Sequence, residues 1–250
     1  ETPFFVGATC GTTVLGAFDP VLEIIEVCKD FDVWLHGDGA FGGSLLLSAQ
    51  HRRLLEGTEY LDSFAWDAHK LMNIPLVCSV ILMRDKSSLG NNLTDINTDY
   101  LYHGEDEGDD LGRKSIQCGR RVDAVKLWFS WKYYGIKGYE DRLNTLIRLS
   151  QYAERTVKAT QELRLMVDRQ SFSVCFQYVP SNGNNAEEVN IRIREELIQS
   201  GLSMVNYGYH KGVMVIRLVV SNGDLTEKDL DQFFTNLLCI AKKIEVSEPV

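Results

Sequence analysis

The stretch that decides the fold is VWLHGDGAFGG, residues 33–43, in which a short apolar run leads to Asp38 and a glycine-rich segment follows. Residues 33–35 are typical of a buried strand, and the glycines open the backbone directly after it. Ligands of open α/β sheets bind beyond the carboxyl ends of the strands. This stretch therefore predicts a strand of such a sheet and a functional position at Asp38.

Lys70 follows a second apolar run of the same kind. Residues 64–66 are Phe-Ala-Trp, and Asp67-Ala68-His69-Lys70 comes directly after them. A lysine amine can form a Schiff base with an aldehyde, and an aspartate can hold a pyridinium nitrogen protonated. These are the two protein groups that a pyridoxal phosphate site needs. On spacing alone, however, a surface lysine and a capping aspartate at strand ends are the commoner case.

The first 83 residues alternate strand and helix patterns. Apolar runs at 4–6 and 77–83 flank the two strands above. Asp19-Pro20 is typical of a helix start, with Asp19 as the N-cap and Pro20 at the first helical position. This alternation predicts an α/β unit with a largely parallel, buried sheet.

The later part of the chain changes character. Residues 91–113 are polar, acidic and glycine-rich, as in a functional lid or a disordered segment. We expect a large domain over residues 1–137, a linking helix over 138–165, and a small α+β domain with a mostly antiparallel sheet over 166–250. In the last of these, strands are expected at 171–179, 204–207 and 213–220, and helices at 187–200 and 227–244.

Composition narrows the function classes. The 250 residues include 26 Lys and Arg against 35 Asp and Glu, which gives a net charge of −9. Nucleic-acid binding and a polybasic membrane anchor are both disfavoured, because each needs clustered positive charge. The sequence contains no run of about 18 apolar residues, so no membrane span is predicted. We therefore expect neither a nucleic-acid partner nor a membrane partner.

The cysteines and the first residues point to a cytoplasmic protein. No two of the six cysteines lie closer than 18 residues, so zinc-site spacings are missing and no metal is expected. Such cysteines are expected to be buried, reduced thiols. The first residues lack a signal-peptide pattern and read as the middle of a fold.

Several segments together carry a specific resemblance. They are HGDGAFGG at 36–43, DAHK at 67–70, IQCGRRVD at 116–123, IRLVVSN at 216–222, and TCGTT with GAFDP within 9–20. In order and with similar gaps, they resemble the group II pyridoxal-phosphate-dependent amino-acid decarboxylases, in the branch of glutamate and cysteine-sulfinate decarboxylases. The resemblance implies a fold type I enzyme, similar to aspartate aminotransferase. The chain would hold the C-terminal part of its large parallel-sheet domain and the small C-terminal domain.

The resemblance also implies roles around the cofactor, pyridoxal 5'-phosphate. Lys70 would form the Schiff base, and Asp38 would pair with the pyridinium nitrogen. Ala40 would pack against the ring, and His69 would lie at the phosphate or next to it. Thr9 and Asp67 fall in matching segments and are placed with them among the cofactor-binding residues.

Two further positions concern the substrate. The resemblance implies that Arg217 binds the α-carboxylate that leaves as carbon dioxide. Tyr100, in the segment matching the family's mobile catalytic loop, would protonate the product carbon, and Tyr102 is an alternative proton donor. A closing loop suits this chemistry because solvent must be kept away while a carbanion exists.

Two segments depart from the family pattern. Asp67-Ala68 stands where the family usually has Asn-Pro, and the Asn amide commonly helps to hold the phosphate. An aspartate there would repel a phosphate dianion, so either Asp67 faces elsewhere or cofactor affinity is lowered. Gly37 and Gly39 replace the usual Val and Ala, which is expected to open room beside the ring.

The sequence thus favours α-decarboxylation of an acidic amino acid (glutamate, aspartate or cysteine sulfinate) through a Lys70 Schiff base. The resemblance implies a homodimer with its active site at the interface. The alternatives are a non-catalytic fragment or pseudo-enzyme, because the N-terminal half of the site is not in this chain, or a decarboxylase for a different amino acid. A transaminase is less favoured, because the segment around residues 117–120 and the acidic loop match decarboxylases.

Overall fold

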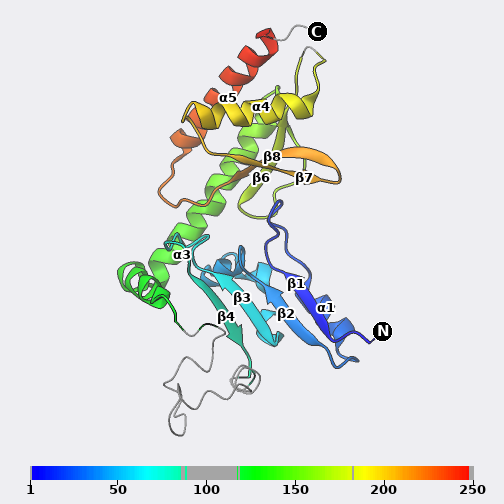
Figure 1. The fold of residues 1–250 in the computed structure, drawn as a ribbon, viewed down its shortest axis with the longest axis vertical. Helices are drawn as coiled ribbons and strands as arrows, with labels where there is room; N and C mark the ends of the chain where they lie inside the picture. The colour runs from blue at the N-terminus through cyan, green and yellow to red at the C-terminus, as the bar shows by residue number, and fades with distance from the viewer. Residues whose placement is uncertain (1, 86–87, 89–116, 118, 182, 248–250) are drawn as a thin grey trace.

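The computed structural model describes residues 2–85, 88, 117, 119–181 and 183–247. The described residues form two four-stranded sheets connected by the long helix α3 (Figure 1). Mixed α/β architecture with a parallel-containing sheet confirms the predicted fold class. The loop at 91–113, with Tyr100 and Tyr102, lies outside the described residues, and the division of the chain into domains stays a prediction.

The first sheet carries the segments that the sequence singled out. Its strands are β1 (Phe5–Thr9), β2 (Trp34–Asp38), β3 (Ser63–Asp67) and β4 (Ser79–Met83), in that spatial order. β1, β2 and β3 run parallel, while β4 is antiparallel to β3. The carboxyl ends of β1, β2 and β3 therefore meet at one edge of the sheet.

Helix α1 (Val21–Cys28) follows β1, but it begins differently from the prediction. Pro20 occupies the N-cap, and no side chain caps the helix. The Asp19 carboxylate instead accepts a hydrogen bond from the backbone N–H of Thr9, at 2.7 Å. The predicted Asp19 N-cap is therefore wrong, because this carboxylate is used to hold the end of β1.

Short 3₁₀ helices fill the connection between β2 and β3. They are η1 (Gly43–Leu47), η2 (Arg52–Leu55) and η3 (Thr58–Tyr60). Gly42, just before η1, packs against the backbone of Cys10 and the ring of Phe18, and a Cβ there would clash with both. This close approach accounts for a glycine at that position.

Helix α3 (Asp123–Ala159) is long and kinked. Gly135 has φ 63° and ψ −178°, so the helical backbone is interrupted there, as expected of a glycine. The helix ends at Ala159, and β5 (Leu163–Leu165) pairs with β6, so the predicted linking helix to residue 165 is too long. Thr160 has extended backbone angles, which turn the chain toward the sheet.

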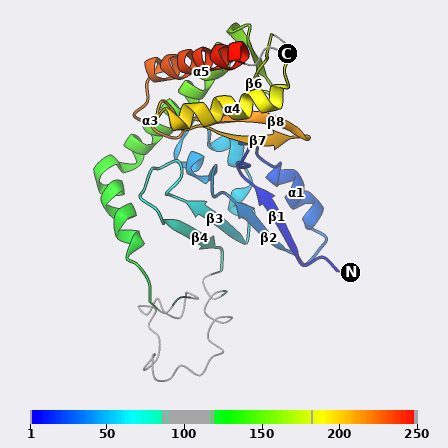
Figure 2. The same ribbon diagram turned by 45° about the horizontal axis from the view of Figure 1, so that its top comes forward.

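The second sheet is antiparallel throughout, as predicted. Its order is β5, β6 (Ser173–Tyr178), β8 (Val213–Val219) and β7 (Asn206–His210). Helices α4 (Ala186–Gln199) and α5 (Glu227–Ser247) lie on the side of this sheet away from β1–β4 (Figure 2). The Asn185 side chain accepts the N–H of Glu187 and caps α4.

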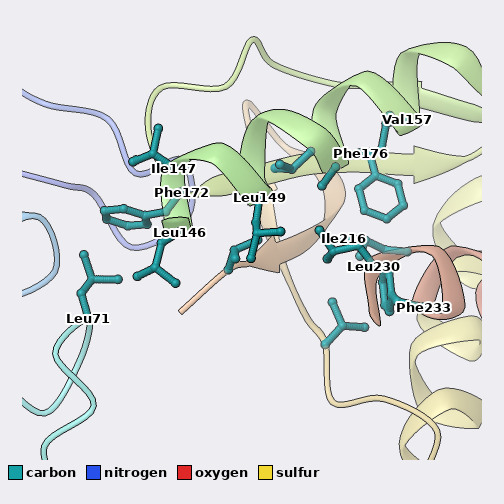
Figure 3. Close-up of a cluster of buried hydrophobic side chains, with 14 of the residues drawn as sticks. Leu71, Leu146, Ile147, Leu149, Val157, Phe172, Phe176, Ile216, Leu230 and Phe233 are labelled. Atoms are coloured by element: carbon teal, nitrogen blue, oxygen red, sulfur yellow. The ribbon is translucent and has the colours of Figure 1, made fainter. Parts of the chain in front are cut away.

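Helix α3 joins the two sheets through a shared apolar core. Figure 3 shows Leu71, from the turn after β3, near Leu146 of α3, with side chains of the second sheet and α5 farther along the helix. Each large side chain buried in this way stabilises the fold by about 1.5–3 kcal/mol. The segment after β3 and strand β8 are therefore fixed to the same helix. Among the described residues, none of the helices is both long and apolar enough to cross a membrane.

Candidate active site

Lys70 lies in a tight turn directly after β3. Its backbone N–H donates to the carbonyl of Asp67 at 3.0 Å, and the N–H of Asn73 donates to the carbonyl of Lys70 at 3.1 Å. Ala68 and Leu71 are buried on either side of this turn. The turn is thereby anchored in the core, while the Lys70 side chain stays 38% exposed.

The carboxylate of Asp67 faces Lys70. Its Oδ2 lies 3.0 Å from Nζ of Lys70 and 3.8 Å from Nε2 of His69. Burial opposes ionisation of Asp67, but a hydrogen bond with Ser79 and the hydrogen bond and charge of Lys70 outweigh it, so the pKa of Asp67 is lowered. Asp67 therefore faces the Lys70 side chain in an ion pair.

The backbone of β4 holds the ring of His69. Nδ1 lies 3.2 Å from the backbone nitrogen of Cys78 and 3.1 Å from its carbonyl oxygen. With Nδ1 engaged by the backbone, Nε2 is the ring nitrogen that faces the carboxylate of Asp67. His69 is therefore fixed in orientation beside Lys70.

Arg217 comes from the other sheet. It lies on β8, paired with Cys175 of β6 and Asn206 of β7. Its guanidinium carbon lies 5.4 Å from the centroid of the Phe41 ring, a cation–π distance. Burial lowers the pKa of Arg217, and its Nε is buried without a hydrogen-bond partner among the described residues. A buried cationic donor left open in this way suits an anionic ligand.

One cavity of about 490 Å³ brings three of the predicted residues together. Lys70, His69 and Arg217 all line it. The remaining lining residues are Thr13, Phe41, Asn73, Val219 and Ser221. The cavity therefore presents an amine from the first sheet and a guanidinium from the second to the same space.

Four other predicted residues lie near this site without lining the cavity. Asp38 is exposed at the end of β2, where its Oδ1 accepts the N–H of Ala40 at 3.0 Å. Asp38 pairs with Ala65 on one side and Thr9 on the other, which places Thr9 at the same sheet edge. Asp67 faces Lys70 as described above.

The two replacement glycines do not open room beside a ring. A Cβ at Gly39 or Gly37 would lie within 3 Å of the Phe64 side chain. The ring of Phe64 occupies the space that the absent side chains would need. The expectation of extra room at these positions is therefore wrong, because a core side chain has taken the space.

Sequence reasoning missed several residues of the cavity wall. Phe41 and Ser221 fall inside segments already quoted for the resemblance, so their position in those segments was the available signal. Asn73 carries no such signal. It adopts φ 55°, and its amide, oriented to donate, reaches the carbonyls of Lys70 at 3.2 Å and Ser221 at 3.0 Å. Asn73 thus connects the turn after β3 to the segment after β8.

These residues fit pyridoxal phosphate in most respects. The exposed carboxylate at the end of β2 suits a ring nitrogen, the amine of Lys70 suits an aldehyde, and the unpartnered Nε of Arg217 suits a carboxylate. Asp67 is the exception, since a carboxylate disfavours a neighbouring phosphate. Asp67 is paired with the free Lys70 side chain in this structure.

Comparisons with known proteins agree with this geometry. Residues 1–179 match the family described as the pyridoxal-dependent decarboxylase conserved domain. The chain is 40% identical over 243 residues to the acidic amino acid decarboxylase GADL1 of Mus musculus, covering 92% of this chain and 44% of that protein. It is 38% identical over 250 residues to the cysteine sulfinic acid decarboxylase of Homo sapiens, covering 94% and 50%.

Solved structures give the same picture. The structure of mouse CSAD in apo form matches with a TM-score of 0.89 and 37% identity, covering 96% of this chain and 52% of that one. The 4-hydroxyphenylacetaldehyde synthase of Rhodiola rosea matches with a TM-score of 0.84 and 26% identity, covering 97% and 50%. The chain therefore spans about half the length of the relatives it matches.

Proposed function

Because this chain belongs to the pyridoxal-dependent decarboxylase family, we propose that the protein removes the α-carboxylate of an acidic amino acid, with pyridoxal 5'-phosphate as its cofactor. The observation that carries the proposal is the shared cavity of Lys70 and Arg217. One residue supplies an amine for an aldehyde and the other a guanidinium for a carboxylate. Their common cavity places both groups within reach of one small ligand.

The cofactor, when bound, supplies an aromatic ring that takes up the electron pair left by the departing carbon dioxide. Lys70 provides the amine that attaches to the aldehyde. Asp38 would accept a hydrogen bond from the protonated ring nitrogen and would keep it charged. Thr9, Ala40 and His69 complete the cofactor's surroundings in this proposal, Ala40 against the ring and His69 toward the phosphate.

Arg217 binds the α-carboxylate in this proposal. Burial of its guanidinium and the unpartnered Nε support the assignment, because a carboxylate satisfies the open donor and the buried charge together. The proton for the product carbon is assigned to Tyr100, with Tyr102 as the alternative. Both tyrosines lie outside the described residues, so this assignment rests on the sequence resemblance.

The names of the relatives support an acidic substrate. The matched proteins at 38–40% identity are named as an acidic amino acid decarboxylase and a cysteine sulfinic acid decarboxylase. A tryptophan decarboxylase of Catharanthus roseus matches at 24% identity, which supports the fold alone. We therefore place glutamate, aspartate and cysteine sulfinate before aromatic substrates.

We also propose a homodimer and a cytoplasmic location. Large apolar side chains are exposed on the first part of α3, including Trp128 and Phe129, and they offer an area for a second chain. In this proposal the active site lies at such an interface, as the family resemblance implies. The cytoplasmic location rests on the sequence reading of the cysteines.

An assay of carbon dioxide release tests the proposal. The purified protein, supplied with pyridoxal phosphate, is expected to decarboxylate at least one of glutamate, aspartate and cysteine sulfinate. Lys70→Ala should abolish both the release and the absorbance of the lysine-bound cofactor, while Lys158→Ala, an exposed lysine of α3, should change neither. Cofactor absorbance identical in the wild type and Lys70→Ala would contradict binding of the cofactor at Lys70 by this chain alone. Turnover only of an aromatic or basic amino acid would contradict the acidic substrate.

A further inference from the structure

The carboxylate of Asp67 stands where the resembled family usually has an amide, and in this chain it contacts Lys70, His69 and Ser79. Lys70 Nζ lies 3.0 Å from Oδ2, and His69 Nε2 lies 3.8 Å from the same oxygen. Replacing an amide with a carboxylate at this point changes the net charge beside the reactive amine. Of Lys70 and His69, Lys70 lies nearer to the added charge.

Local backbone geometry brings the two side chains together. The Lys70 N–H donates to the Asp67 carbonyl at 3.0 Å, closing a tight turn in which residues three apart share a face. Asp67 is the last residue of β3 and pairs with Ser79 of β4. The carboxylate is thus fixed at its base by the sheet, and the amine is brought to it by the turn.

The surroundings hold the carboxylate in place. Ser79 hydrogen-bonds to it from β4, and His69 faces it with a ring held by the backbone of Cys78. The Asp67 side chain is 17% exposed, whereas Lys70 is 38% exposed. The amine therefore has freedom to leave the pair toward the cavity, and the carboxylate does not.

Capture of an aldehyde by Lys70 requires a neutral amine. The ammonium first gives one proton to solvent, the nitrogen lone pair then attacks the aldehyde carbon, and the aldehyde oxygen leaves as water when the C=N bond forms. Asp67 Oδ2, 3.0 Å from Nζ, holds the nitrogen in an ion pair. The nitrogen must leave this pair before it can reach the aldehyde.

We propose that Asp67 is a positioning residue that holds the Lys70 amine in an ion pair and so slows its reaction with an aldehyde, acting on the amine and not on the cofactor phosphate. This inference rests on the proposed function, in which Lys70 is the cofactor-bearing lysine. The ion pair keeps the amine beside the cavity. The amine must be released from Asp67 before it reacts, and binding of the ligand has to drive that release. The usual amide at this position offers no such charge.

Labelling kinetics in the purified protein test this role without any measurement of turnover. Wild type and Asp67→Asn are treated at pH 7 with pyridoxal or with pyridoxal phosphate, cyanoborohydride traps the product, and peptide mass spectrometry gives the rate at Lys70. With pyridoxal, which carries no phosphate, Asp67→Asn should react about two- to fivefold faster, in line with the strength of partly exposed ion pairs. A similar or larger gain is expected with pyridoxal phosphate.

A second ion pair in the same chain serves as the control. Asp123 and Lys126 are also three residues apart, with 2.7 Å between their charged atoms, and Lys126 donates in addition to the carbonyls of Pro75 and Val77. Asp123→Asn should leave labelling of Lys70 unchanged, and Asp67→Asn should leave labelling of Lys126 unchanged. If Asp67→Asn loosened the fold in general, the labelling rates of Lys70 and Lys126 would rise together, and the proposal would be overturned.

Two other results would also overturn it. Equal Lys70 rates in wild type and Asp67→Asn with pyridoxal would mean that the carboxylate does not hold the amine. A gain confined to pyridoxal phosphate would mean that Asp67 acts on the phosphate. The proposed function fails separately, if pyridoxal phosphate modifies Lys70 no faster than the exposed Lys158, while the pyridoxal comparison still decides the role of Asp67.

Discussion

The guanidinium of Arg217, on the second sheet, lies 5.4 Å from the ring centroid of Phe41, on the segment that follows β2 of the first sheet. Phe41 itself packs edge-on against Phe172, with ring centroids 4.3 Å apart. The aromatic ring is therefore held by Phe172, the residue before β6, and contacts the arginine. Under the proposed function, this contact sets where a carboxylate binds relative to Lys70.

Phe41→Leu is expected to weaken substrate binding. Without the cation–π contact, the guanidinium of Arg217 is no longer held in one orientation. The interaction that is lost is worth about 0.5–2 kcal/mol. The KM for the acidic amino acid should rise, with a smaller change in kcat. Phe31→Leu, an exposed phenylalanine between α1 and β2, is the control and should leave KM unchanged. A fall in kcat alone would contradict this account.

Arg217→Met is expected to separate stability from activity. The buried Nε has no partner among the described residues, and a buried donor without a partner costs about 1–3 kcal/mol. Removing it should leave the unfolding midpoint in urea unchanged or raise it, while decarboxylation is lost. A clear drop in the midpoint would show that contacts such as the one with Phe41 outweigh the cost of the unpartnered Nε.

Glu154→Gln is expected to destabilise the protein at neutral pH and not in acid. Burial opposes ionisation of Glu154, but Lys158 at 2.9 Å and Arg169 at 3.1 Å outweigh it and lower its pKa. The stabilisation is complete above the unfolded-state pKa, about 4.3, and is lost as pH falls through the lower folded-state pKa. Urea unfolding of both proteins from pH 7 to pH 2.5 checks this. A difference that persists at the lowest pH would contradict it.

Asn73 variants are expected to follow a fixed order of stability. Asn73→Gly keeps the backbone at φ 55° but loses the amide that reaches Lys70 and Ser221, at a cost of about 1–2 kcal/mol. Asn73→Ala loses the amide and also strains a backbone that alanine disfavours, by roughly 1–2 kcal/mol more. Urea unfolding should rank wild type above Asn73→Gly and Asn73→Ala lowest. Equal stability of Asn73→Gly and Asn73→Ala would show that backbone strain at φ 55° does not destabilise the alanine variant.

The sequence was sufficient to predict the elements whose residue pattern is local. The apolar runs ending at Asp38 and Asp67 correctly predicted strands of one parallel sheet, because a strand's composition and its terminating residues lie next to each other in the chain. The antiparallel second sheet followed from the same kind of pattern. The helix boundary at Ala159 was missed, since apolar spacing continues into Leu163, which the sheet uses as a strand.

The residue types at the site were also set by the sequence: an amine, a carboxylate and a guanidinium in segments that match one family. Tertiary structure decided how they are used. Phe64 fills the space at Gly39, Asp67 turns toward Lys70, and the cavity pairs Lys70 with Arg217, 147 positions later in the chain. Such outcomes depend on which distant side chains share a volume and a charge balance, and only the packing of both sheets on α3 settles that.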